Sequence, residues 1–134
     1  MSIKSVREGI AANLEAITGL HVMAFVPDNP TPPMAVVVPS GVRFDTAFHR
    51  GSDEYAMEVL VIVARASERG AQDTLDAYCD SKGTVSVKTA IESDRSLGGA
   101  AASLRVTDIT SYGPLAVGET QYLAATFAVQ VVTL

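Results

Sequence analysis

The sequence predicts an α+β fold: a single mostly antiparallel or mixed β-sheet with an N-terminal helix and two central helices packed on it, in the order α-β-β-β-α-α-β-β. Three observations support this class. Apolar residues recur at helical spacing near the N-terminus, a strand that is apolar on both faces follows, and two further strands end the chain. At 134 residues, one domain spanning 1–134 is the natural count, and it can bury a core.

The first helix is predicted from apolar residues that recur at steps of three and four. Ser2 can cap its start, and Gly19 can take the left-handed position just past its end. A short strand, residues 21–26, follows, and the four prolines among residues 27–33 then predict a turn-rich connector too short to separate domains. The periodic apolar residues are Ile3, Val6, Ile10, Leu14 and Ile17.

Two strands surround the longest segment that has no helical pattern. Met34–Val38 is a valine-rich strand that ends at Pro39, and Tyr55–Arg65 is a strand with apolar residues on both faces of its second half. The second strand is therefore expected at the centre of the sheet, covered on two sides. The 15 residues Ser40–Glu54 form a long loop. Loops of this length are uncommon in compact domains unless they are functional or disordered.

That loop is the candidate contact surface. Aromatic residues and arginine commonly anchor protein interfaces, so we expect the loop to dock onto another protein. The competing interpretation is that Phe44 and Phe48 fold back and pin the loop onto its own domain. The candidate interface residues are Arg43, Phe44, Phe48, His49 and Arg50.

Two helices are predicted in the middle of the chain. The first begins at Ser67 and ends before Gly83, which suits a helix stop. The second is shorter, is capped by Ser86 and runs through Ile91. The apolar face of the first helix consists of Ala71, Leu75, Tyr78 and Cys79.

Two strands are predicted at the end of the chain. They cover Ala101–Thr110 and Gln121–Val132 and are joined across Tyr112–Pro114 and Gly118. The end of the last strand, Phe127–Leu134, can cover an edge of the sheet or reach a neighbouring chain.

An acidic stripe is predicted on the first of the two central helices. Asp73, Asp76 and Asp80 fall at i, i+3 and i+7, so they share one face. A solvated polar face is the simplest interpretation, since amphipathic helices routinely carry one. Binding of a divalent ion would need ligands from elsewhere in the chain. In a ring, the same stripe could instead line an acidic lumen.

The composition excludes several classes of partner. The net charge is −5, and the basic residues are scattered, which disfavours nonspecific binding of duplex DNA. An acidic surface suits a channel that nucleic acid crosses without adhering.

The single cysteine, Cys79, permits no intrachain disulfide and fits a cytosolic protein. No run approaches the about 20 apolar residues of a membrane span, and the N-terminus lacks the apolar segment of a signal peptide.

No catalytic, cofactor or metal site is predicted. The two histidines, His21 and His49, have no second histidine or cysteine at metal-ligand spacing. Cys79 is expected to be a buried structural residue. The segment Ser81–Thr84 lacks the upstream glycines of a phosphate-binding loop and follows a helix instead of preceding one. We therefore expect no enzymatic activity.

With these elements in order, nearly the whole chain resembles the tail terminator proteins of long-tailed (siphovirus-type) bacteriophages. The resemblance begins with the helix ending at Leu14, the Gly19-Leu20 pair and the proline-rich turn before the valine-rich strand. It continues through the following segments: Phe44-Asp45, Phe48–Gly51, Asp53–Tyr55, Leu75–Tyr78, Gly83–Val87, Ala90-Ile91, Leu97–Gly99 and Tyr112-Gly113.

The resemblance implies a structural virion protein with no catalytic activity. Its subunits would form a hexameric ring at the head-proximal end of the tail tube, stop tube polymerisation and present a surface to the head-completion or connector protein. Genomic DNA would pass the lumen without specific binding, and the ring would assemble in the host cytoplasm. A tail tube or head-completion subunit is the first alternative. A small ligand-binding or enzymatic domain is the second, and it would need a concave pocket with convergent polar groups.

Overall fold

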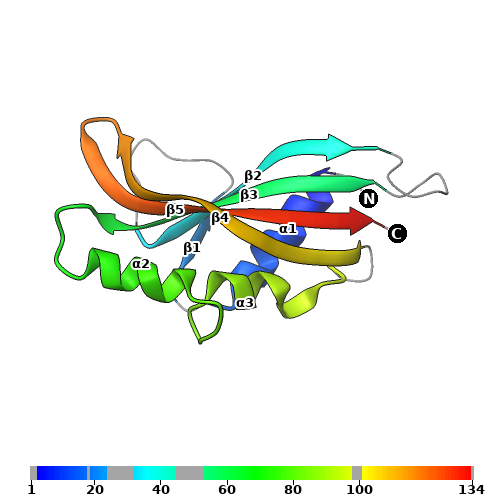
Figure 1. Ribbon diagram of the computed structural model, residues 1–134, viewed down its shortest axis with the longest axis horizontal. Helices are drawn as coiled ribbons and strands as arrows, with labels where there is room; N and C mark the ends of the chain where they lie inside the picture. The colour runs from blue at the N-terminus through cyan, green and yellow to red at the C-terminus, as the bar shows by residue number, and fades with distance from the viewer. Residues whose placement is uncertain (1–2, 18, 24–31, 45–52, 98–100, 134) are drawn as a thin grey trace.

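The computed structural model describes residues 3–17, 19–23, 32–44, 53–97 and 101–133 (Figure 1). The order of helices and strands agrees with the predicted order, so the α+β class is confirmed. The elements are α1 (Ile3–Leu14), β1 (His21–Met23), β2 (Met34–Arg43), β3 (Glu54–Arg65), α2 (Ala71–Cys79), α3 (Val87–Ile91), the 3-10 turn η1 (Glu92–Asp94), β4 (Ala101–Val117) and β5 (Thr120–Thr133).

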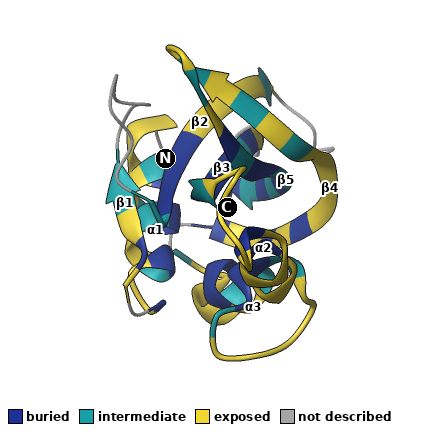
Figure 2. Ribbon diagram, turned by 90° about the vertical axis from the view of Figure 1, so that its left-hand side faces the viewer, coloured by how far each residue is buried: buried dark blue, intermediate teal, exposed yellow. Residues whose placement is uncertain are grey.

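The strands form one five-stranded mixed sheet in the order β1-β2-β3-β5-β4. Strand β1 is parallel to β2, and the other neighbours are antiparallel. Strand β3 is the central strand, as its apolar residues on both faces predicted. Strand β4 lies at the edge of the described sheet and is largely exposed (Figure 2).

The main core lies between one face of the sheet and the three helices. Helices α2 and α3 lie along the same side of the sheet (Figure 1), and α1 contributes Val6, Ile10 and Leu14 to the same core. Val59 and Phe127 are among the sheet residues that pack there, and both are almost fully buried. Burial of each such side chain contributes about 1.5–3 kcal/mol, so this shared core fixes which face of each helix turns inward.

A second, smaller core lies on the opposite face of the sheet. Met34, Val36, Ile62, Tyr122 and Ala124 are buried there, on β2, β3 and β5. The tip of the β4–β5 hairpin curls away from the rest of the sheet (Figure 1) and supplies partly buried apolar residues to this cluster. Both faces of the sheet are therefore covered near the β4–β5 turn.

Strand β2 continues past the proline that was predicted to end it. Its pairing with β3 shifts register between Pro39 and Gly41 and then resumes, up to Arg43 opposite Glu54. The prediction of a loop over Ser40–Glu54 is therefore wrong at both ends. A register shift tolerates proline because the missing N–H falls where the ladder is already interrupted.

Strand β4 likewise continues through the predicted connector Tyr112–Pro114 and ends at Val117. The turn to β5 is at Gly118, whose φ of 62° lies in the left-handed region that favours glycine. Proline is compatible with β4 because this strand is at an edge. The end of the last strand does not lie at an edge of the sheet: β5 pairs with β3 as far as Val132 and with β4 as far as Thr133, and Leu134 lies outside the described residues.

Both long helices are shorter than predicted. Helix α1 ends at Leu14, and a turn leads to buried Ile17 and to Gly19 in the left-handed conformation, φ 84°. Helix α2 begins at Ala71, not at Ser67. The chain before it is still bound to the sheet, because the amide of Ala66 donates to Gln121 O at 2.9 Å. The predicted strand over residues 21–26 is described only as β1, and residues 24–26 lie outside the described residues.

Ser86 caps α3 as predicted. Its Oγ accepts a hydrogen bond from the amide of Thr89 at 3.2 Å and donates to the carbonyl of Asp80 at 2.6 Å. The residue is 1% exposed, so neither partner is readily replaced by water. The side chain therefore holds the start of α3 and the end of α2 together.

We predict that Ser86→Ala lowers the free energy of unfolding by about 1–2 kcal/mol, the usual cost of losing such a cap. Urea unfolding followed by circular dichroism would measure it. Ser81→Ala, at an exposed position nearby, is the control and should stay within about 0.5 kcal/mol of the natural chain. Equal stability of the two variants would show that the cap contributes nothing.

Candidate assembly surface

The end of the β2–β3 hairpin carries the described part of the predicted contact loop. Arg43 lies opposite Glu54 in the ladder, and Phe44 follows it directly. The Phe44 side chain is 70% exposed, so it does not fold back onto its own domain. The other candidates of that loop, Phe48, His49 and Arg50, lie outside the described residues.

The predicted acidic stripe is exposed along α2, but its members differ. Asp76 accepts a hydrogen bond from the hydroxyl of Tyr112 at 2.5 Å and so joins α2 to β4. This hydrogen bond to Asp76 raises the pKa of Tyr112. Asp80 ends the helix, with its carbonyl bound by Ser86. Asp73 is exposed in the first turn of α2, where the helix dipole favours a negative charge.

A groove lies between β4 and the connection from α2 to α3, and we name it the β4 groove. It measures about 250 Å³. Phe127 lies in the core beneath it, and Ile109 remains 39% exposed at its wall. The residues that define it include Cys79, Lys88, Val106, Asp108, Ile109 and Phe127.

The thiol of Cys79 in this groove is a weak nucleophile. Burial, and then the charge of Asp76, raise its pKa to about 11. The thiol is therefore protonated near neutral pH, whereas a nucleophilic cysteine needs a lowered pKa. The position suits a packing role, although the side chain is only half-buried.

Glu92 fixes the wall of the β4 groove. Its carboxylate binds the Lys88 ammonium group at 2.6 Å and Arg95 at 3.3 Å, and it accepts a hydrogen bond from the amide of Val106 at 2.9 Å. Burial alone would raise the pKa of Glu92, but the Lys88 and Val106 hydrogen bonds and the two positive charges outweigh it and lower that pKa. The network therefore ties η1 and α3 to the edge strand.

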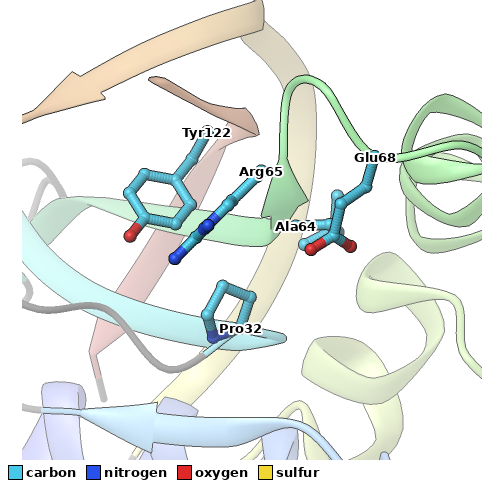
Figure 3. Close-up of a pocket in the computed structure, with 6 residues that line it drawn as sticks. Pro32, Ala64, Arg65, Glu68 and Tyr122 are labelled. Atoms are coloured by element: carbon cyan, nitrogen blue, oxygen red, sulfur yellow. The ribbon is translucent and has the colours of Figure 1, made fainter. Parts of the chain in front are cut away.

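A smaller pocket of about 180 Å³ lies at the end of β3, beside Tyr122 (Figure 3). Arg65 extends alongside the ring of Tyr122, with Pro32 beside them, and Glu68 lies on the other side. Arginine stays protonated in proteins, so Arg65 and Glu68 do not form an acid–base pair. Among the residues that the structure describes, no group of three or more His, Cys, Asp and Glu could hold a metal ion. In the same residues, no helix is long and apolar enough to cross a membrane.

Comparison with known proteins extends the description of the fold. No family model matches the chain, and no curated protein matches it. One matching solved structure is 18% identical, covers 100% of this chain and 97% of its own, and superposes with a TM-score of 0.51. At this identity the match supports the fold alone.

The sequence did not predict the β4 groove or the hydrogen bond from Tyr112 to Asp76. The groove combines residues near positions 79, 106 and 127, which are distant in sequence. Tyr112 was assigned to a connector because Gly113 and Pro114 follow it. The local signal for this surface is the presence of two large apolar side chains, Ile109 and Tyr112, among the polar residues of this segment.

We predict that Glu92→Gln lowers the free energy of unfolding by about 1–2 kcal/mol at pH 7. The substitution removes the negative charge of a hydrogen-bonded side chain that is only 9% exposed. The folded-state pKa is lowered, so the stabilisation is fully present above the ordinary value of 4.5 and disappears as the pH falls through the lowered pKa.

The difference in the free energy of unfolding between the natural chain and Glu92→Gln should therefore decrease in acid. Urea unfolding at several pH values would measure it. Glu8→Gln is the matched control, since Glu8 and Lys4 are both exposed and 3.9 Å apart. Such a pair contributes at most about 1 kcal/mol. A pH-independent difference for Glu92→Gln would contradict the assignment.

Proposed function

We propose that this chain is a subunit of a tail terminator ring of a long-tailed bacteriophage. The ring would cap the head-proximal end of the tail tube, end tube polymerisation and present a surface to the head-completion protein. The observation that carries the proposal is the order and spacing of elements along nearly the whole chain, which resemble those of that family; the structure arranges these elements as one covered sheet.

The exposed surface supports a role in assembly. Phe44 projects at the hairpin end, and Ile109 and Tyr112 are exposed on β4. Neighbouring apolar groups such as Ile109 and Tyr112 mark protein contacts more often than isolated ones do, and an exposed aromatic ring such as Phe44 is a common interface anchor. The β4 groove and the pocket beside Arg65, by contrast, are smaller than most ligand-binding sites.

The charge distribution supports a passage for DNA. The chain carries a net charge of −5; Asp73 and Asp76 are exposed on α2, and exposed Asp80 directly follows the helix in an extended conformation. If this face lines the lumen, phosphate groups would be repelled and DNA would cross without adhering. The ring would then act as a passive channel during packaging and ejection.

We expect the purified chain to form a discrete oligomer, and six chains of 14.0 kDa give 84 kDa. Light scattering after size exclusion, over a range of concentrations, would measure the mass, and negative-stain electron microscopy would show the shape. A single closed ring with a central channel supports the proposal. Open stacks would favour a tail tube subunit, and a monomer at every concentration would contradict a preformed ring.

A further inference from the structure

The middle of β4, residues 107–112, pairs discontinuously with β5. Thr107 and Thr110 have no opposite residue on β5, because the register shifts at each of them. Residues 107–112 are all exposed as well. On its other side, β5 pairs with β3 without a register shift from Glu54 to Ile62. Of the two strands beside β5, the middle of β4 is therefore the less firmly paired one.

The hydroxyl groups of the two unpaired threonines compensate only in part. Thr107 Oγ1 lies 3.3 Å from the carbonyl oxygen of Ala128, and Thr110 Oγ1 lies 3.5 Å from that of Thr126. Both distances exceed the about 2.5–3.0 Å that is usual between a hydroxyl and a carbonyl oxygen. Thr107 also donates its single hydroxyl proton to the Asp108 carboxylate at 2.5 Å. These contacts with β5 are therefore weak.

Two carboxylates from the helical side hold the ends of this segment. Glu92, in η1, accepts a hydrogen bond from the amide of Val106 at 2.9 Å, directly before the segment. Asp76, on α2, accepts a hydrogen bond from the hydroxyl of Tyr112 at 2.5 Å. Glu92 is itself bound by the Lys88 ammonium group at 2.6 Å. The segment is thus fastened at both ends by side chains and loosely paired in between.

The same segment lies over the β4 groove. Thr107, Asp108 and Ile109 line the groove together with Cys79 and Phe127. Phe127 is 1% exposed, so the core beneath is closed while β4 is in place. Strand β5 lies between β3 and β4 in the sheet, so β4 also shields one edge of β5. Displacement of the segment would therefore uncover both an apolar hollow and a strand edge.

We propose that residues 107–112 of β4 form a strap that opens as one unit and thereby uncovers the β4 groove and the edge of β5. Regions with few buried contacts and weakly paired backbone open before the whole domain unfolds. Glu92 and Asp76 set how often the strap opens, because each holds one end. An open strap would present unpaired N–H and C=O groups of β5 to another chain. The strap belongs to the single chain and does not depend on the proposed ring.

Hydrogen exchange followed by mass spectrometry tests the strap in the natural chain. The protected amides of residues 107–112 should exchange at least about tenfold faster than those of residues 57–62 in the central strand β3. Low concentrations of urea should speed exchange in β3 but hardly change it in the strap, because a small opening exposes little surface. Equal rates with equal dependence on urea would overturn the proposal, since β4 would then open only when the whole domain unfolds.

Two variants test whether the strap opens as one unit. Tyr112→Phe and Glu92→Ala each remove one tie, so each should speed exchange across all of residues 107–112 by at least about threefold. Glu8→Ala, which removes an exposed carboxylate from α1, is the matched control and should leave these rates unchanged. Circular dichroism would establish that each variant is folded. Faster exchange only beside the removed tie, or no change in either variant, would contradict a strap that opens as one unit.

Cys79 reports whether the groove is uncovered, because it is the only cysteine of the chain and lines the groove. Alkylation of its thiol should be at least about threefold faster in Tyr112→Phe than in the natural chain and unchanged in Glu8→Ala. Measurement at several pH values separates a changed pKa of the thiol from changed access to it. Equal alkylation rates in Tyr112→Phe and the natural chain would show that the strap does not control the groove.

Discussion

The need to cover both faces of β3 is the constraint on which the rest of this structure depends. Val59 and Val61 face the helices, whereas Ile62 faces the second cluster with Val36. Each such side chain would lose about 1.5–3 kcal/mol if it were left in water, so β3 cannot lie at an edge. The three helices cover one face, and the curled tip of the β4–β5 hairpin covers part of the other (Figure 1).

That arrangement places β4 at the edge and decides how much of it stays open. Glu92 holds the strand at Val106, and Asp76 holds it again at Tyr112. Between these two ties, the connection from α2 to α3 leaves Ile109 partly uncovered above Phe127. The groove thus follows from where the helices end, and the charged network gives its wall a defined shape.

The sequence predicted the features that depend on neighbouring residues. The Ser86 cap is such a feature, because its side chain binds an amide three residues away. The central position of β3 followed from its own alternation. That β2 continues past Pro39 and β4 past Pro114 could not be predicted. Whether proline interrupts a strand depends on a register shift or an edge position. The β4 groove, which joins residues distant in sequence, was likewise outside the reach of local patterns.

The edge strand of the described sheet limits how copies of this chain could pair. Pairing along β4 would add strand to strand, but β4 has register shifts near residues 102, 107 and 110 and contains Pro114, and such interruptions oppose edge-to-edge growth. The interrupted edge strand therefore disfavours growth by adding strand to strand.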